Sequence, residues 1–420
     1  MAVEPSLAPE TDISVQETLL AASQHNLTQL RRLLSIYSYA ECASVDVQDP
    51  ETGFSPLHAT IAACEIDEVA VNGNGGSPNF PTAESNASDL DPQRQELLAG
   101  AAETVRFLLQ NGAIWNQLDK KDETPGCLAY RLRLTELYSL MVDAGVRAEI
   151  LLNRLDGYEE LQDSDDEESK AQDADQTPNG NVQAEEKPVD IVAAQFARHD
   201  VDSTQYLSSA LSIDASKIMD EHSNGVMMSW ESDIMAKSAS CLLTRPDIKV
   251  LNIGFGMGIV DNHIQQHANR PKSHHIIEAH AAVLADMESK GWLSKPGVVV
   301  HKGRWQDVLP RLLNEGHAFD AIFFDTFAET YTDFRIFFSD YVVGLLNEAG
   351  NFSFFNGMGA DRQISYDVYQ KVVEIDLLET GFDVVWHDVP VPTLDHEWDR
   401  VKRKYWNVGN YRLPVCSYAD

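Results

Sequence analysis

The segment Val250–Ile259, VLNIGFGMGI, constrains the fold of this chain more than any other stretch. An apolar run typical of a buried strand passes directly into three alternate glycines, after which a helical pattern begins. Glycine permits a tight turn and lets a ligand approach the backbone, and the start of a helix offers unpaired N–H donors. A dinucleotide fingerprint would place its third glycine at Ile259, but here it falls at Gly258, so the spacing argues against a pyrophosphate site of that kind.

Strand-like and helix-like stretches alternate over about 170 residues around this segment. Strands are predicted at 249–253, 274–278, 298–301, 321–324, 352–355 and 382–387, with a last one within 405–415. Helices are predicted at 226–243, 260–267, 281–290, 334–347 and 364–379. Such alternation predicts an α/β fold with a doubly wound, mostly parallel sheet that binds ligands at the carboxyl ends of its strands.

Polar residues stand where three of these strands end. Glu278 follows Gly258 by 20 residues, where an acid can accept the ribose hydroxyls of an adenosine, although an exposed Glu capping a helix would give the same pattern. Arg304 and Trp305 follow the third strand, where adenine is normally contacted, although Trp305 fits a plain core aromatic almost as well. Asp325 closes an apolar run and is therefore expected in the crevice where substrate meets cofactor.

A second acid, Glu231, lies four residues from both Met227 and Met235, a spacing that places all three on one helix face. The alternative is a Glu in the first exposed turn of that helix. Two carboxylates facing one site suit a guanidinium, whose donors form a fork that matches carboxylate oxygens. A guanidinium is also a poor nucleophile, because its pKa is above about 12, so carboxylates that orient it and accept a proton would assist its methylation.

Beyond these patterns, the G-x-G-x-G loop resembles motif I of Rossmann-like methyltransferases, and residues from about 188 to 420 resemble guanidinoacetate N-methyltransferase. The resemblance is carried by VMMSWESDIM at 226–235, GFGMGI at 254–259 and FDTF at 324–327. With its helical N-terminal part, the chain is similar to the fungal protein arginine N-methyltransferase 2 family, which methylates the internal δ nitrogen (N5) of protein arginine. This likeness implies S-adenosyl-L-methionine as the methyl donor and a protein substrate with an accessible arginine.

The resemblance also implies residue roles. Glu231 and Asp325 match the acids that hold the guanidino group. The implied cofactor contacts are Tyr206, Met227, Met235, Gly254, Phe255, Gly256, Met257, Gly258, Ile259, Glu278, Ala279, His280, Arg304, Trp305 and Asp325. The chain departs from the family at Ser229 and Asp233, where Arg and Pro are usual, and neither change removes a proposed catalytic group. The two-glutamate hairpin of the common arginine methyltransferases, S-E-x-M-G-x-x-L-x-x-E, is not found, which argues against ω methylation by that machinery.

The N-terminal part contains two similar segments. GFSPLHA at 53–59 resembles the opening of an ankyrin repeat, and KDETPGCLA at 121–129 is a degraded second copy. Ser55 and Thr124 are 69 positions apart, so a period of about 33 leaves roughly 36 positions for an insertion, which a Gly/Asn/Ser/Pro-rich stretch near 66–98 supplies. The pattern predicts an ankyrin-repeat-like all-α domain over 1–155 with a disordered insertion; the alternative is an ordinary helical domain with a chance match.

Charge separates the two parts. Residues 156–187 hold 12 acidic and 2 basic side chains and few large apolar ones, so they are expected to form a disordered linker ahead of a methyltransferase domain at 188–420. The net charge of -34 disfavours nucleic acid and favours a basic protein partner, for which the N-terminal domain is the expected docking module.

Composition bounds the cellular setting. No apolar run approaches the length of a membrane span, and the first residues do not read as a secretory signal. The five cysteines form no C-x-x-C, so neither a disulfide framework nor a metal cluster is indicated, and cytoplasm or nucleus is expected.

The sequence therefore favours a protein arginine N5-methyltransferase that uses S-adenosyl-L-methionine. One alternative is a small-molecule guanidino N-methyltransferase, although a free metabolite requires no appended recognition domain. The other is a binding protein whose methyltransferase fold is inactive, which would have no physical need for both acids and an intact glycine loop.

Overall fold

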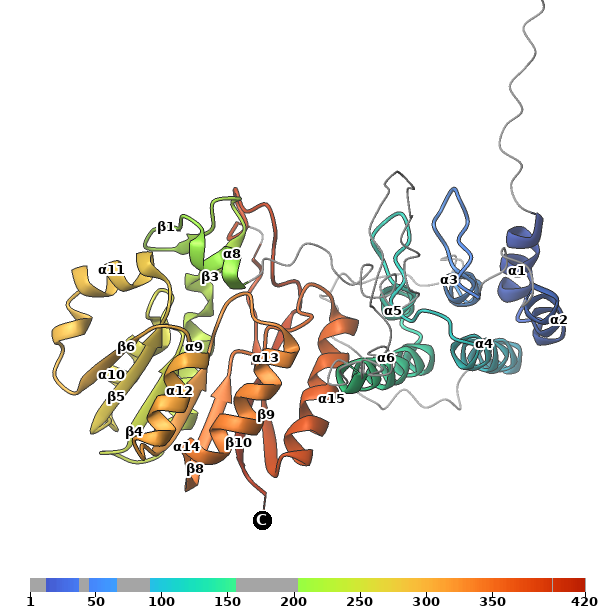
Figure 1. Ribbon diagram of the computed structural model, residues 1–420. Coiled ribbons are helices and arrows are strands. Elements are labelled where there is room, and N and C mark those ends of the chain that lie inside the picture. The colour runs from blue at the N-terminus through green and yellow to red at the C-terminus, as the bar shows by residue number, and fades with distance from the viewer. Residues whose placement is uncertain (1–12, 38–44, 66–90, 156–202, 395, 420) are drawn as a thin grey trace, which may run out of the picture. The chain divides into compact units, whose positions relative to one another are not determined.

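The computed structural model describes residues 13–37, 45–65, 91–155, 203–394 and 396–419 (Figure 1). The chain divides into two compact units, one made of residues 1–150 with 358–372 and the other of 151–357 with 373–420. The linker predicted at 156–187 lies outside the described residues, as does the predicted insertion up to residue 90. None of the helices in the described ranges combines the length and the apolar character needed to cross a bilayer.

The described N-terminal residues are helical. The helices are α1 (Ile13–Ser23), α2 (Leu27–Tyr37), α3 (Pro56–Ala62), α4 (Pro92–Gln110), α5 (Pro125–Arg131) and α6 (Thr135–Leu155). Because α4 begins at Pro92, residues 92–98 are helical and do not belong to a disordered insertion, which corrects the expected end of that segment. The Pro at position 92 fits the first turn of a helix, where its missing N–H costs nothing.

The two similar N-terminal segments begin α3 and α5 in the same way. Ser55 and Thr124 are the N-cap residues, each followed by a proline, and each side chain accepts a hydrogen bond from the backbone N–H three residues later. The His58 ring in α3 lies 3.2 Å from the Glu123 carbonyl, which joins the start of one segment to the start of the other. The sequence similarity therefore reflects two equivalent helix starts that contact each other.

The second unit is built on a seven-stranded sheet in the order β6-β5-β4-β7-β8-β10-β9. Its strands are β4 (Lys249–Ile253), β5 (Ser273–Glu278), β6 (Val298–Lys302), β7 (Phe319–Phe324), β8 (Leu346–Phe354), β9 (Phe382–Pro390) and β10 (Asn410–Tyr418). The first five strands in this order are parallel, and β10 is antiparallel to both of its neighbours. The predicted Rossmann-like, mostly parallel sheet is confirmed.

Helices flank this sheet in Figure 1. They are α8 (Ser203–Ser208), α9 (Ser232–Leu242), α10 (Ile259–Gln266), α11 (Ala281–Ser289), α12 (Trp305–Asn314), α13 (Tyr331–Ile336), α14 (Val343–Leu345) and α15 (Gln363–Glu379). The helix α12 was not predicted, although its buried residues Trp305, Val308, Leu309 and Leu312 have helical spacing. The helix predicted at 334–347 is confirmed over most of its length, because α13, a π-helical turn at Phe337–Val342 and α14 follow one another without a break up to Leu345. It is wrong only at its end, where β8 already begins at Leu346.

The predicted helix at 226–243 is also wrong at its start. A small antiparallel sheet forms there from β1 (Ser212–Ile213), β2 (Lys217–Met219) and β3 (Gly225–Met228). A 3-10 turn at Ser229–Glu231 follows, and α9 begins only at Ser232. Met227 faces Ile218 across β2 and β3, so its backbone is extended, and Met227, Glu231 and Met235 do not share one helix face.

Candidate active site

The carboxyl ends of three adjacent parallel strands bring the glycine loop and two acids to one edge of the sheet. Ile253 on β4 pairs with Ile277 on β5 and with Phe324 on β7, so the residues that follow these three are neighbours. The Gly254 N–H donates to the Ile277 carbonyl at 2.9 Å, and the Asp325 N–H donates to the Ile253 carbonyl at 2.8 Å. This is the edge at which open α/β sheets bind ligands.

Two glycines of the loop are required by close packing. Gly254 has φ +90°, and a Cβ there would lie 1.8 Å from the Asp325 carbonyl oxygen. Gly256 has φ +53°, and a Cβ there would lie 2.7 Å from the Met227 sulfur. That sulfur in turn lies 3.2 Å from the Met257 N–H, which donates to it. The loop is therefore a cradle that Met227 covers from β3. The Asp325 backbone excludes a side chain at Gly254, and the positive φ disfavours one at Gly256.

We expect Gly254→Ala to lower the free energy of unfolding by more than about 1 kcal/mol beyond the loss in Gly381→Ala. Gly381 has φ +91° but no atom within 4 Å of its hypothetical Cβ, so it carries the backbone strain without the clash. Chemical denaturation of both full-length variants measures the difference. Equal losses would show that the Asp325 carbonyl places no constraint on the loop.

Glu278 is buried and fastened to the loop. Its Oε2 accepts from the Phe255 N–H at 2.9 Å, and its Oε1 accepts from the N–H groups of Ala279 and His280 at 2.8 and 2.7 Å. Burial raises the pKa of Glu278, and these amide bonds oppose the rise. The alternative of an exposed helix cap is wrong, because only 8% of Glu278 is exposed. A carboxylate accepts about four bonds, so Oε2 keeps capacity for a ligand hydroxyl.

Tyr206 reaches the same edge from α8. Its ring centroid lies 5.0 Å from that of His280 and 4.9 Å from that of Phe327. Burial raises the pKa of Tyr206, and the charges of Glu278 and Asp325 raise it further. The His280 Nδ1 accepts from the Ala282 N–H at 3.1 Å, so the ring proton is on Nε2, 3.2 Å from the Ser209 carbonyl.

Other expected cofactor contacts lie in the core. Trp305 is 3% exposed and donates from Nε1 to the Glu329 carboxylate at 3.1 Å, which favours its interpretation as a core aromatic. Met235 is fully buried, in a cluster with Val250 and Val260. Phe255 is also buried and packs against Trp292 and neighbouring side chains. Ile259 packs at the margin of the Met235 cluster, and Arg304 precedes α12 with its guanidinium 3.2 Å from the Ser203 hydroxyl.

Glu231 ends the 3-10 turn that follows β3 and is buried, with 2% of its surface exposed. Its Oε1 accepts from the Met228 N–H at 3.0 Å and from the Tyr405 hydroxyl. Burial raises the pKa of Glu231 to about 8, and the charge of Asp325 contributes to the rise. The alternative of a solvated Glu in an exposed first turn is therefore wrong.

Asp325 is the second acid of the pair. Burial raises its pKa to about 7, with a contribution from the charge of Asp261. Its Oδ2 is buried without a hydrogen-bond partner among the described residues, and so is the hydroxyl of the adjacent Thr326. Buried polar atoms are rarely left unpaired, because each costs free energy. Together with the Glu231 carboxyl group, these atoms fit a ligand that brings several donors and a positive charge.

Sequence reasoning missed Tyr405, Asn252 and Asp261. The Asn252 amide donates to the buried Asp261 carboxylate at 2.9 and 3.0 Å and to the Gly254 carbonyl at 2.8 Å, so it holds the glycine loop from within β4. An Asn inside an apolar strand was the available signal for this network. Nothing local marks Tyr405, which lies 174 positions from Glu231 along the chain.

Known proteins resemble this chain over different lengths. The guanidinoacetate N-methyltransferase family matches residues 206–384. Protein arginine N-methyltransferase 2 of Aspergillus fumigatus is 53% identical, over 97% of this chain and 97% of its own. The Aspergillus oryzae protein of the same name is 54% identical over 99% and 100%. The Neurospora crassa protein of that name is 42% identical over 96% and 95%.

Solved structures are more remote. Spermidine synthase from Thermotoga maritima matches with a TM-score of 0.35 and 14% identity, over 50% of this chain and 72% of its own. The O-methyltransferase TomG from Streptomyces achromogenes, in complex with SAM, matches with a TM-score of 0.32 and 14% identity, over 47% and 83%.

Proposed function

Because the chain belongs to the protein arginine N-methyltransferase 2 family, we propose that it transfers a methyl group from S-adenosyl-L-methionine to the δ nitrogen of arginine residues in protein substrates. The observation that carries the proposal is the buried Glu231 carboxyl group after β3 together with Asp325 at the sheet edge, whose Oδ2 is buried without a partner among the described residues. A guanidinium supplies both the positive charge and the fork of donors that this pair lacks.

The two carboxylates would orient the guanidino group and take up the proton that the δ nitrogen loses. Their pKa values of about 8 and about 7 lie near neutral pH, which suits a general base. When bound, S-adenosyl-L-methionine supplies an electrophilic methyl group. The residues that fit it are the cradle from Gly254 to Gly258, the free capacity of Glu278, and the Tyr206 ring.

We expect Glu278→Ala to weaken S-adenosyl-L-methionine binding by about 1–3 kcal/mol, because it removes a charged acceptor and the bonds that fix the loop. Isothermal titration calorimetry of the full-length protein measures this change. Glu288→Ala, on the exposed surface of α11, is the matched control and should bind as the wild type does. Unchanged affinity in Glu278→Ala would remove this residue from the cofactor site.

The acid pair also predicts a pH dependence. We expect kcat/KM to rise with pH between about 6 and 8, because a protonated carboxyl can neither hold the cation nor accept its proton. The free energy of unfolding should instead fall as pH rises. In the unfolded chain both carboxyl groups have their ordinary, lower pKa values, whereas in the folded protein the pKa values are raised. The free protein therefore becomes less stable as pH rises toward 8. Initial rates and thermal unfolding across pH 5.5–9 test both slopes, and a flat rate profile would contradict the acid pair.

Mass spectrometry of modified arginines tests the proposed reaction. Incubation of the protein with labelled S-adenosyl-L-methionine and a cell lysate should label arginine, and fragmentation distinguishes δ from ω products. If only ω-methylated arginine is found, the δ nitrogen is not the acceptor, but methyl transfer to arginine still stands.

A small-molecule guanidino methyltransferase is the second candidate, because the guanidinoacetate N-methyltransferase family matches residues 206–384. The two candidates are distinguished by measuring kcat/KM for guanidinoacetate and for a purified protein substrate identified by the labelling experiment, each offered at the same concentration. A higher kcat/KM for guanidinoacetate would favour the second candidate.

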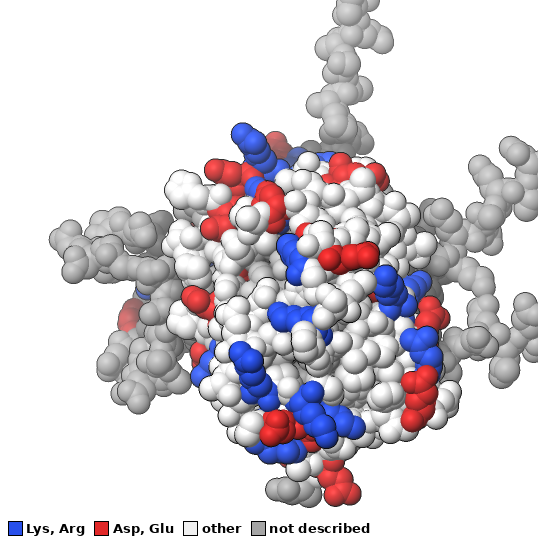
Figure 2. Space-filling view, turned by 90° about the vertical axis from the view of Figure 1, so that its left-hand side faces the viewer, with Lys and Arg blue, Asp and Glu red and all other residues white. Residues whose placement is uncertain are grey.

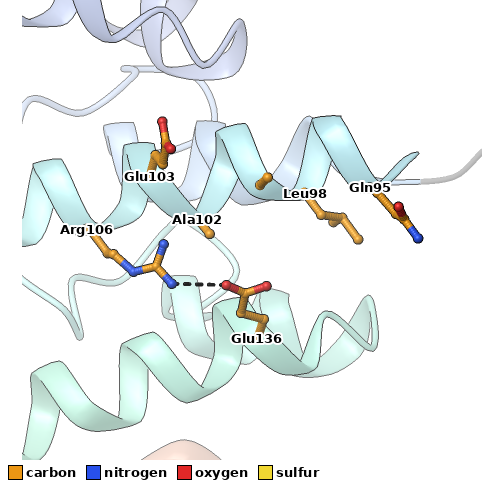
Figure 3. Close-up of a pocket in the computed structure, with 7 residues that line it drawn as sticks. Gln95, Leu98, Ala102, Glu103, Arg106 and Glu136 are labelled. Atoms are coloured by element: carbon orange, nitrogen blue, oxygen red, sulfur yellow. Dashed lines mark hydrogen bonds and ion pairs between the residues drawn. The ribbon is translucent and has the colours of Figure 1, made fainter. Parts of the chain in front are cut away.

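We further propose three parts along the chain: an ankyrin-repeat-like domain at 1–155, a disordered linker at 156–187 and the methyltransferase domain at 188–420. The first of these is proposed to dock a basic protein substrate. Equivalent N-caps at Ser55 and Thr124 support the repeat. Within this part, α4 and α6 border a groove that Glu103, Arg106 and Glu136 line (Figure 3). A lower KM for a whole protein than for a short peptide with the same arginine would support docking, and equal values would contradict it.

The preference for a basic partner rests on the net charge of -34. Figure 2 shows basic and acidic side chains mixed on one face of the molecule, so that face alone does not select a partner by its charge.

Cytoplasm and nucleus are the proposed compartments, because Cys64, Cys127, Cys241 and Cys416 are free thiols in the described ranges.

A further inference from the structure

The segment 399–405 runs beside the residues that lead into β3 of the small sheet and is fastened to them and to β2 by hydrogen bonds. The Lys402 N–H donates to the Ser223 carbonyl at 2.9 Å, and Arg403 forms a parallel bridge with Asn224. The Lys217 ammonium, on β2, donates to the Asp399 carbonyl at 2.8 Å. These bonds fix the segment at several points, so the residue at its end is delivered to a defined place.

Tyr405 ends this segment, and its ring is enclosed. The centroid of the Trp230 ring lies 6.2 Å from it in a stacked arrangement, and the Trp398 ring meets it edge-on at 5.1 Å. On a third side is Gly225 in β3, where a Cβ would come within 3.2 Å of the Tyr405 ring. This packing leaves the ring little freedom and aims its hydroxyl at Glu231.

The two oxygens of Glu231 differ in their partners. Oε1 accepts from both the Tyr405 hydroxyl and the Met228 N–H. No hydrogen-bond donor from the described residues reaches Oε2. One oxygen is thus held by the protein, and the other remains available to a ligand.

We propose that Tyr405 is a positioning residue for Glu231: its hydroxyl and the Met228 N–H hold Oε1, so that Oε2 is presented to the guanidino group in its charged form. This inference rests on the proposed function, because it assumes that Glu231 contacts the substrate. A hydrogen bond donated to a carboxylate favours the ionised form and so lowers its pKa, against the rise from burial. Burial and the Glu231 charge raise the pKa of Tyr405 well above 10, so the hydroxyl keeps its proton and remains a donor.

The pH profile of Tyr405→Phe tests this role. The titratable groups that act on Glu231 are Asp325 and Tyr405, and only the second is changed. We expect the acid limb of kcat/KM to move upward by about one pH unit, the effect of one lost hydrogen bond to a charged group. At pH 7 this lowers kcat/KM roughly tenfold, and raising the pH should restore most of the loss.

Tyr411→Phe is the matched control. Tyr411 is fully buried in the same unit, and its hydroxyl donates to the Phe354 carbonyl at 3.3 Å and accepts from the Asn356 N–H at 3.0 Å, without contacting Glu231. Its loss should lower the unfolding temperature and leave the acid limb where the wild type has it. A purely structural role of Tyr405 would give the same result as this control.

A second variant keeps the test valid if Tyr405→Phe folds poorly. Placing 3-fluorotyrosine at position 405 preserves the shape and strengthens the donor, so the acid limb should move downward. An unshifted limb in either folded variant overturns the positioning role, as does a loss in Tyr405→Phe that no pH restores. A wild-type protein that methylates no arginine would instead overturn the proposed function.

Discussion

Replacing Asp325 with asparagine is expected to lower turnover on an arginine substrate at least about 100-fold, the lower range for losing a general base. The substitution keeps the size and shape of the side chain but removes the charge and the basicity, and it replaces one acceptor oxygen with a donor NH₂ group. Oδ2 of Asp325 is buried with no partner among the described residues, so it is free to accept a hydrogen bond from a bound guanidino group. Cofactor affinity should change far less, because the loop and Glu278 remain intact. Initial rates and calorimetry measure the two quantities.

Asp320→Asn is the matched control, because it makes the same chemical change within β7, the strand that Asp325 follows. Asp320 lies in β7 five residues before Asp325, and it pairs with Arg245 at 2.8 Å. Turnover in this control should stay within a few-fold of wild type, since the pair is partly exposed and contributes little. Near-wild-type turnover in Asp325→Asn would mean that the paired-carboxylate mechanism is wrong.

The sheet edge could be predicted because its signals are local. The strand before the glycines was placed at its observed bounds, Lys249–Ile253, since an apolar run that ends in glycine marks both its length and its end. Once the strands are parallel and adjacent, the residues after Ile253, Ile277 and Phe324 must meet. The position of Glu278 and Asp325 therefore followed from strand ends alone.

The surroundings of Glu231 could not be predicted in the same way. The four-residue spacing of Met227, Glu231 and Met235 imitates a helix, whereas the actual conformation of Met227 is decided by pairing with β2. Such pairing depends on tertiary contacts that override local spacing. Glu231 also accepts a hydrogen bond from Tyr405, and no pattern within the length of a helix or strand could connect two residues so far apart in the sequence.

The N-terminal part likewise has one feature that could be predicted from the sequence and one that could not. Ser55 and Thr124 each precede a proline, and the structure uses both as helix caps, so a short motif was enough to predict two helix starts. The boundary of the insertion was less predictable, because residues 92–98 are polar enough to resemble a loop and yet form the first turns of α4. Composition alone therefore did not mark the start of α4.

Glu231→Gln should lower turnover to a similar extent as Asp325→Asn, and the double variant should fall clearly less than the product of the two losses. The charge of Asp325 raises the pKa of Glu231, so the two acids are electrostatically coupled. Both are proposed to hold one rigid, planar cation, so once either grip is lost the other no longer fixes its orientation. Initial rates for the wild type, both single variants and the double variant give the interaction energy directly. Multiplicative losses would mean that the two acids act on independent steps. Full activity in Glu231→Gln would mean that Glu231 has only a structural role, as the hydrogen-bond acceptor of Tyr405 and the Met228 N–H.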